Sequence, residues 1–590
     1  KNPQKGRKAA PSSGEGRAMY VPTPQTGPIK ARGYPQRSDS AQKPVFFARA
    51  REKEPHPPIL QDLETSNEKE VARMILLRGM DRFNRVLACR DTFLTGIVRE
   101  ALGLVRFDPS LVEAFGKDMD LAAKTAKKGR LMDLIWRDAD LPAFPGFVDT
   151  IVPSDFDSTE PSSLALHAGR PRSMDAELLL VLWAVDGVFS LTCREGHDRL
   201  AGSEVFQALV EDGPAPARTT VAKYLALVSP ETRDMAHKAL HRMVLKEELD
   251  TFEELTVDST AVAANTAWPA ESALIGGFLR RIHRLLERQA VHTGVAYGSK
   301  KVARWLKELD DLHRDIGLLG SGKGTPARRK SLYRKLLKVA GKTSQTLRDL
   351  LGRRRDRIEE RCIAPTVRVR VDAMMECVER SFGETERAME SARRRMLLGE
   401  DVAASDKVYS LADPDAYMIV KGGRDPVVGY KPQIGRSAKG FVTCFEVTPG
   451  NPGDGERLLP MVEAHSEATG RKPLAVSTDD GYASADNLER LVGEGVEVVS
   501  FSGAKGRRAL GDDIYECDAA RLLRNERSAV ESTMFTLKHK LGLRRFCRRG
   551  IEGVRADLSA TVFAHNLWRL AHVRSAKQRE EESPGRRTSA

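Results

Sequence analysis

The chain has 590 residues, which is too many for one hydrophobic core, so several domains are expected. Its formal net charge of +13 predicts a polyanionic partner, and no apolar run is long enough to span a bilayer, which favours nucleic acid over a membrane. The seven cysteines are scattered without a CxxC pair, so the sequence indicates neither a disulfide framework nor a zinc site.

The two ends of the chain have compositions typical of disorder. Residues 1–60 are rich in Pro, Gly, Ser, Lys and Arg and show no periodic pattern of apolar residues. Residues 571–590 form a short segment rich in polar and charged residues. We therefore expect a disordered basic segment at the start and a disordered tail at the end. Residues 61–168 predict a mostly helical region to which the sequence assigns no chemistry.

Residues 169–250 predict short helices joined by Gly and Pro turns. Three such segments in succession are typical of a helix-turn-helix-like DNA-binding region, and the third, PAPARTTVAKYLALV, would be its recognition helix. Arg218 and Lys223 would then face DNA. Short helices with a basic residue at one end are also common in ordinary helical domains, so both interpretations stay open.

The pattern changes to a β-strand at residues 251–269, where LTVDSTAVA places Asp258 in the downstream half of the strand. An unpaired carboxylate in a strand is costly, so Asp258 needs a hydrogen-bond partner or a metal. Residues 270–400 predict a helical basic insertion. Its segment 321–360 carries 13 Lys or Arg against 4 Asp or Glu, which favours contact with backbone phosphates over a merely solvated face.

Strand patterns return within residues 401–570. Segments 406–423, 425–435 and 441–451 predict three strands of an antiparallel meander, and two further strands then alternate with helices. This order predicts an α/β fold with a mixed sheet flanked by helices. PLAVSTDDGY places Asp479 at the carboxyl end of a strand, where α/β sheets position ligand sites.

Residues 524–549 predict one helix with two stripes. Val530, Met534, Leu537 and Leu541 recur at helical spacing and would pack on a core. Arg527, Glu531 and Lys538 form a second stripe, with a carboxylate between two cations. For an isolated segment, intrahelical ion pairs on a solvated face are the simpler interpretation.

Asp258, Asp479 and Glu531 together suit two-metal phosphoryl transfer. Mg²⁺ prefers oxygen ligands, and carboxylates from separate elements can flank a pair of ions that activates the attacking oxygen and stabilises the leaving one. Asp480, Asp512 and Asp513 are rival ligands, but the GDD sequence at 511–513 is typical of an exposed turn.

The three acidic motifs resemble those of the DDE transposases of bacterial insertion sequences. Arg527, Glu531 and Lys538 match R-x3-E-x6-K, the DDGY segment at 479–482 matches D-x-G-[YF], and the first-strand DST at 258–260 matches the first acid. The order and context of the motifs extend the resemblance over residues 169–267 and 401–570. The departure is Arg524, which stands where the family usually has a tyrosine.

The resemblance implies an RNase H-like catalytic domain formed by residues 251–269 and 401–570. Asp258, Asp479 and Glu531 would be catalytic residues that bind two Mg²⁺ ions, for which Mn²⁺ could substitute. Arg527, Lys538 and Arg524 would contact phosphate, and the nearby residues Arg544, Arg545, Arg548 and Arg549 would extend this basic track.

The implied function is cleavage of double-stranded DNA at the ends of a mobile element and joining of those ends to target DNA, by a homodimer on DNA. No signal peptide is evident, so a cytoplasmic, nucleoid-associated protein is expected. Two alternatives stay open. One is an RNase H-fold nuclease without strand transfer, and the other is a catalytically inactive, transposase-derived DNA-binding protein.

Overall fold

The computed structural model describes residues 81–90, 92–120, 174–188, 202–210, 216–320, 324–361, 365–421 and 425–582. The disorder expected for residues 1–60 lies outside these ranges, as does the part of the expected helical region 61–168 that falls at 61–80, 91 and 121–168. Every helix within them is too short or too polar to cross a membrane.

A five-stranded mixed sheet is the centre of the α/β part, in the order β6-β5-β1-β7-β8. The strands are β1 (Glu254–Ser259), β5 (Gln433–Arg436), β6 (Val442–Glu446), β7 (Ala475–Thr478) and β8 (Val498–Phe501). β7 pairs in parallel with both β1 and β8, whereas β5 pairs antiparallel with both β1 and β6. The expected mixed α/β fold is therefore confirmed.

A second sheet of three short strands has the order β2-β4-β3, formed by Val262–Ala263, Val427–Tyr430 and Tyr417–Ile419. The prediction of one strand over 425–435 was wrong, because this segment breaks into β4 and β5, which join different sheets. The break falls at Pro432, which has no N–H for a ladder hydrogen bond. Its carbonyl instead accepts from the Thr260 N–H at 3.0 Å.

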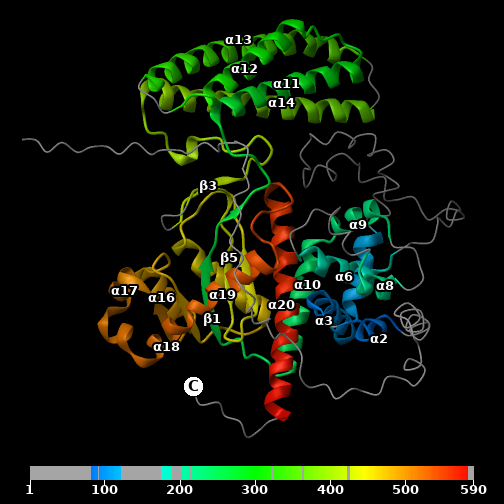
Figure 1. The fold of residues 1–590 in the computed structure, drawn as a ribbon, viewed down its shortest axis with the longest axis vertical. Coiled ribbons are helices and arrows are strands. Elements are labelled where there is room, and N and C mark those ends of the chain that lie inside the picture. The colour runs from blue at the N-terminus through cyan, green and yellow to red at the C-terminus, as the bar shows by residue number, and fades with distance from the viewer. Residues whose placement is uncertain are drawn as a thin grey trace, which may run out of the picture. The chain divides into compact units, whose positions relative to one another are not determined.

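Helices surround the five-stranded sheet. They are η6 (Gly455–Arg457), α15 (Leu458–Thr469), α16 (Ala485–Gly493), α17 (Gly503–Glu516), α18 (Asp518–Glu526), α19 (Ser528–Phe535) and the π-helical turn η7 (Thr536–Lys540). α17 and α18 both contact β8, and they lie together with α16 in Figure 1. Apolar residues of α15, α16 and α17 meet Leu255, Val257 and Val476 of the sheet in one buried cluster. Both acid-bearing strands β1 and β7 thus have a packed core beneath them.

The predicted single helix over 524–549 is wrong in its extent. α18 ends at Glu526, α19 begins at Ser528, and the chain leaves helical geometry after η7. The apolar stripe is nevertheless confirmed, because Val530, Met534, Leu537 and Leu541 are all buried.

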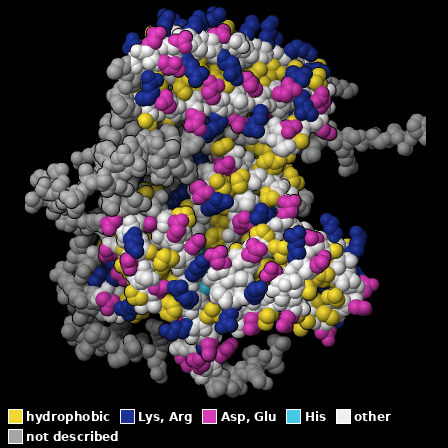
Figure 2. Space-filling view, turned by 180° about the vertical axis from the view of Figure 1, so that it is seen from behind, with side chains coloured by type: hydrophobic (Ala, Val, Ile, Leu, Met, Phe, Trp, Pro, Cys, Tyr) yellow, Lys and Arg dark blue, Asp and Glu magenta, His cyan; other side chains and the backbone are white. Residues whose placement is uncertain are grey.

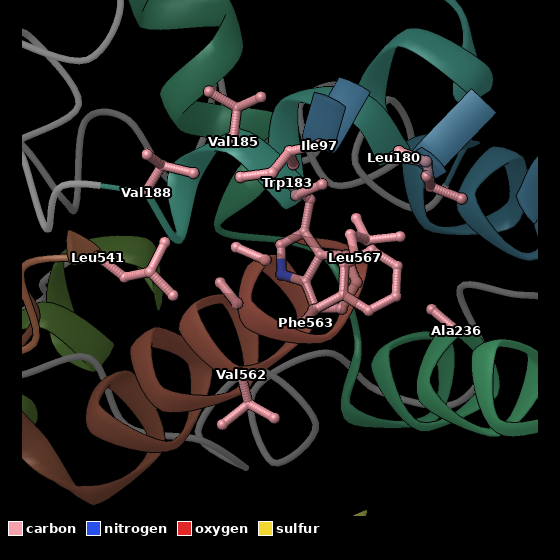
Figure 3. Close-up of a cluster of buried hydrophobic side chains, with 14 of the residues drawn as sticks. Ile97, Leu180, Trp183, Val185, Val188, Ala236, Leu541, Val562, Phe563 and Leu567 are labelled. Carbon is pink, nitrogen blue, oxygen red and sulfur yellow. The ribbon is translucent and has the colours of Figure 1, made fainter. Parts of the chain in front are cut away.

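Six helices of the described ranges precede β1: α2 (Arg82–Leu87), α3 (Phe93–Phe107), α6 (Ala176–Asp186), α8 (Glu204–Val210), α9 (Arg218–Leu225) and α10 (Pro230–Lys246). Of these, α3, α6 and α10 pack against the long C-terminal helix α20 (Gly550–Glu582), whereas α2 and α8 contact α3 and α9 contacts α6. Trp183 of α6 stacks on Phe563 of α20, with ring centroids 4.5 Å apart. Figure 3 shows this pair together with Leu541 from the end of the apolar stripe.

The disordered tail expected from residue 571 does not begin there, because α20 continues to Glu582. Polar contacts fix this last part of the helix. The Arg574 guanidinium pairs with Glu100 of α3 and with Glu247 after α10, and Lys577 Nζ donates to the Glu247 carbonyl at 2.7 Å. Such partners are distant in sequence, so the local composition could not indicate them.

Residues 271–398 form four long helices that lie side by side (Figure 1) and have a hydrophobic core of their own. The helices are α11 (Glu271–Thr293), α12 (Lys300–Gly317), α13 (Thr325–Glu359) and α14 (Pro365–Ala392), followed by the π-helical turn η4 (Arg393–Leu398) and by η5 (Ala404–Asp406). Apolar residues at helical spacing, such as Ile275, Leu279 and Ile282, are fully buried between the helices. We call this part the helical bundle.

Three buried histidines connect elements of the α/β part. His237 of α10 bonds the Ser559 hydroxyl, His465 of α15 bonds the Phe252 carbonyl, and His565 of α20 bonds the Gly440 carbonyl. Burial lowers the pKa of His237 to about 3, of His465 to about 4 and of His565 to about 4. Each imidazole is therefore neutral in the folded protein.

We predict that the protein loses stability steeply as the pH falls from about 6.5 to 4. Histidines in the unfolded chain bind protons in this window and the buried ones do not, so acid favours unfolding by roughly 1–2 kcal/mol per histidine at pH 5. Thermal melts across this pH range measure the effect. His465→Gln should flatten the pH dependence and the exposed His539→Gln should not, and equal slopes for both would contradict the assignment.

Candidate active site

Two carboxylates lie at the same edge of the sheet because adjacent parallel strands carry them. Val257 of β1 is in register with Thr478 of β7, so Asp258 and Asp479 follow at neighbouring positions. Asp258 is buried, and its Oδ1 accepts from the Ser259 N–H at 2.6 Å. Asp479 Oδ1 accepts from the Gly481 N–H at 2.9 Å. The sheet thus brings together two acids that are far apart in sequence.

The neighbouring carboxylates of Asp258 and Asp479 repel each other, so a positive charge beside them is favourable. Burial, and next the negative charge of Asp258, raise the pKa of Asp479 above its ordinary value. Lys421 supplies one such charge, with Nζ 3.1 Å from Asp258 Oδ1 and 3.0 Å from the Ser259 hydroxyl. Sequence reasoning missed Lys421, and the only local signal was a lysine before Gly-Gly at the end of a predicted strand.

A third aspartate, Asp454, lies close to this pair, but its negative charge is already compensated by Lys431. Its Oδ1 accepts from Gln433 Nε2 at 2.9 Å and lies 3.2 Å from Lys431 Nζ. Burial alone would raise the pKa of Asp454, but the Gln433 hydrogen bond and the Lys431 charge hold it below its ordinary value. Gln433 also accepts from the fully buried Tyr482 hydroxyl. These residues support the edge that carries Asp258 and Asp479.

Gly481 has a steric role at this edge. A Cβ added to it would lie 3.0 Å from Asp479 Oδ1 and 3.4 Å from Asp454 Oδ2. A side chain at this position would therefore push the two carboxylates out of place. The Gly and Tyr of the DDGY segment thus hold Asp479 by close approach and by buried packing.

Glu531 faces the pair through Arg527 instead of touching it. Arg527 lies between α18 and α19, with Nη2 3.6 Å from Glu531 Oε1 and Nη1 3.9 Å from Asp258 Oδ2. The Glu531 side chain is 67% exposed. Within the described ranges, no three His, Cys, Asp or Glu side chains are grouped closely enough to hold a metal ion. The structure therefore brings Asp258 and Asp479 together. Glu531, the third predicted acid, is separated from Asp258 by the guanidinium of Arg527.

Lys538 and Arg524 differ in their surroundings from Arg527. Lys538 Nζ donates to the Ala261 carbonyl at 2.8 Å, so it fastens η7 to the turn between β1 and β2. Arg524 lies over the Tyr515 ring, with its guanidinium carbon 3.9 Å from the ring centroid, and is half-buried there. Both cations have protein partners, which sequence spacing could not reveal.

The four arginines of the basic track after η7 differ in their exposure: Arg544, Arg545 and Arg549 are exposed, whereas Arg548 forms ion pairs within the protein. Arg544 and Arg545 are exposed, on a segment that pairs with Ala263 of β2. Arg548 forms ion pairs with Asp186 and Asp557, at 2.9 Å and 2.5 Å, so its predicted place in the track was wrong. Arg549 is exposed, and its Nε donates to the Asn265 carbonyl.

Arg218 and Lys223 lie on α9, which packs against α6 through the buried residues Val221 and Leu225. Lys223 is exposed and Arg218 is half-buried. Among the described residues, no ion pair or hydrogen bond joins either cation to Asp258 or Asp479, whose side-chain partners include Lys421, Arg527 and Gly481.

Asp480 has a structural partner that distinguishes it from Asp479. Its Oδ1 accepts from the backbone N–H groups of Lys505 and Gly506 at 2.7 Å and 3.0 Å, which fixes the start of α17. Asp512 pairs with Arg507 at 2.6 Å. These rivals are therefore engaged within the α17 region.

Comparisons with known proteins address the same part of the chain. The family model described as "Transposase DDE domain" matches residues 415–567, a range that contains Asp479, Arg527, Glu531 and Lys538. The resemblance to the DDE transposases of insertion sequences is confirmed. Asp258 lies before the matched range and joins it through the β1–β7 pairing.

A curated relative has the name "Transposase for insertion sequence element IS1106", from Neisseria meningitidis serogroup B. It is 27% identical over 184 residues, which cover 31% of this chain and 61% of the relative. The match thus spans less than two thirds of the relative's length. No solved structure matches the chain.

Proposed function

We propose that the protein is a transposase that cleaves DNA at the ends of a mobile element and joins them to target DNA by metal-assisted phosphoryl transfer. The observation that carries the proposal is the meeting of Asp258 and Asp479 at one sheet edge, with Glu531 connected to Asp258 through Arg527. The transposase domain match over residues 415–567 supports the same assignment.

The residues at this edge fit hard divalent cations such as Mg²⁺ or Mn²⁺. All three predicted ligands offer carboxylate oxygens, and the raised pKa of Asp479 beside Asp258 marks a place where added positive charge is favourable. Bound cations would activate the attacking oxygen and stabilise the leaving one. Glu531 would complete the set by moving from the Arg527 guanidinium towards the two aspartates, because its side chain is largely exposed and free to turn.

The cations around the carboxylates would hold the DNA backbone. Arg527 is close to both Asp258 and Glu531 and can orient a phosphate between them. Arg544 and Arg545 provide exposed charge on the segment beside β2. Lys538 acts as a positioning residue in this account, since its bond to Ala261 ties the Glu531 helix to the end of β1. Cleavage and joining need both element ends, so we propose that two copies act together on DNA.

The test is an assay of the purified protein on DNA that carries the sequences flanking its gene. We expect cleaved ends and covalently joined products when Mg²⁺ or Mn²⁺ is present, and neither when the divalent cation is chelated. Cleaved ends without joined products would instead indicate the nuclease alternative. Binding with no cleavage under any metal condition would indicate a catalytically inactive DNA-binding protein.

A further inference from the structure

The outer face of α13 in the helical bundle carries an unusual run of unpaired positive charge. Between Asp315 and Asp349 the sequence has no acidic residue, and the α13 residues within it carry seven exposed cations. They are Arg328, Arg329, Lys330, Arg334, Lys335, Lys338 and Lys342. Figure 2 shows a row of Lys and Arg side chains along the outer edge of the bundle.

Helical geometry places four of these cations on one ridge. Lys330, Arg334, Lys338 and Lys342 are four residues apart and follow one ridge about 18 Å long. The opposite face of this part of α13 is buried against the bundle through residues such as Tyr333 and Leu336. The charges therefore point away from the bundle core, where they can meet a partner without any change in packing.

Other arginines of the bundle, unlike the seven α13 cations, are paired with nearby glutamates. Arg380, Arg387 and Arg393 form ion pairs with Glu376, Glu384 and Glu390, at 3.1, 2.6 and 2.8 Å. None of the seven α13 cations takes part in an ion pair with another described residue. A surface kept merely soluble is expected to mix both signs, as α14 does, so the α13 face is specialised for a partner.

We propose that the outer face of α13 binds the phosphate backbone of duplex DNA outside the active site. This inference rests on the proposed function, because that function makes DNA the partner. About 18 Å of duplex presents on the order of ten phosphate charges, so the length and charge of the ridge suit a backbone contact. The face offers no aromatic platform within the ridge, which favours sequence-independent contact over base readout.

The experiment compares two triple variants of the full chain in binding to a short duplex of arbitrary sequence, without divalent cation. Arg334→Gln, Lys338→Gln and Lys342→Gln remove unpaired charges, whereas Arg380→Gln, Arg387→Gln and Arg393→Gln remove paired ones. Both triples lower the net charge equally. We expect the first to bind roughly tenfold to hundredfold more weakly and to lower the slope of log K against log salt by about 2.7, and the second to bind almost normally.

Equal weakening by both triples would overturn the proposal, since net charge alone would then explain binding. Preferential binding to vesicles of phosphatidylcholine and phosphatidylserine, lost in the first triple while DNA binding is unchanged, would overturn it as well. The double variant Lys338→Arg with Lys342→Arg keeps both positive charges and should bind the duplex as the parent does. This result would show that loss of charge, not the change of side chain at these positions, weakens binding in the first triple variant. Loss of cleavage by Asp258→Asn with unchanged duplex binding separates this proposal from the proposed function.

Discussion

Asp258→Asn and Asp479→Asn are each expected to lower the rate of DNA cleavage by roughly three orders of magnitude or more. The physical reason is that an amide cannot offer two anionic oxygens to a divalent cation, and loss of transition-state charge stabilisation costs several kcal/mol. Single-turnover cleavage in Mg²⁺ measures the effect.

The same variants should fold normally, which distinguishes lost chemistry from lost structure. Burial and the charge of Asp258 raise the pKa of Asp479, so the ionised form is disfavoured in the folded state. Replacing Asp479 by the neutral asparagine relieves this repulsion, and the thermal midpoint should be unchanged or higher. A lowered midpoint would mean that the carboxylate pair is structural.

Asp480→Asn is the matched control, because it removes a carboxylate from the adjacent position. Asp480 accepts two backbone N–H groups at the start of α17, and the amide oxygen of asparagine can accept both, so this variant should lose little stability and little activity. If Asp480→Asn abolished cleavage while Asp479→Asn did not, the ligand assignment would be reversed.

Arg548→Met is expected to destabilise the folded protein by roughly 3–5 kcal/mol. Arg548 is the common partner of Asp186 on α6 and Asp557 on α20, and both side chains are largely buried. Burial raises the pKa of Asp186 against the opposing charge of Arg548, so removing the guanidinium would leave two uncompensated acids. Denaturant unfolding measures the loss.

The control for Arg548 is Arg555→Met. Arg555 pairs with Glu552 three residues away, and both side chains are about half exposed. Such a surface pair contributes about 0–1 kcal/mol, so this variant should unfold almost as the parent does. Adding Asp186→Asn and Asp557→Asn to Arg548→Met should restore part of the stability. A loss that the added substitutions do not reduce would contradict the account of buried charge.

The local patterns of the sequence were sufficient to place two of the acids. Period-two apolar residues predict the strands that carry Asp258 and Asp479, and the carboxyl ends of such strands are where α/β sheets position ligands. The apolar stripe from Val530 to Leu541 was also predictable, because burial on one helical face leaves a period of 3.6 in the sequence.

Long-range partners could not be predicted in the same way. Arg548 looked like one more cation of a basic track, but its two acids lie 362 and 9 residues away in sequence. Lys421 contacts Asp258 across 163 residues, and only the sheet pairing makes that contact. A charged residue has the same local pattern whether it faces solvent, DNA or a buried acid, so its role depended on the structure.

The most direct test of the account concerns Glu531, the acid that stands one guanidinium away from the other two. The measurement is joining of a 3′-labelled element end to target DNA by Glu531→Gln in Mg²⁺, beside Glu526→Gln, which changes an exposed glutamate one helix earlier. We predict that Glu531→Gln lowers joining by roughly a hundredfold or more and that Glu526→Gln leaves it almost unchanged. Equal joining by both variants would contradict a site built from Asp258, Asp479 and Glu531.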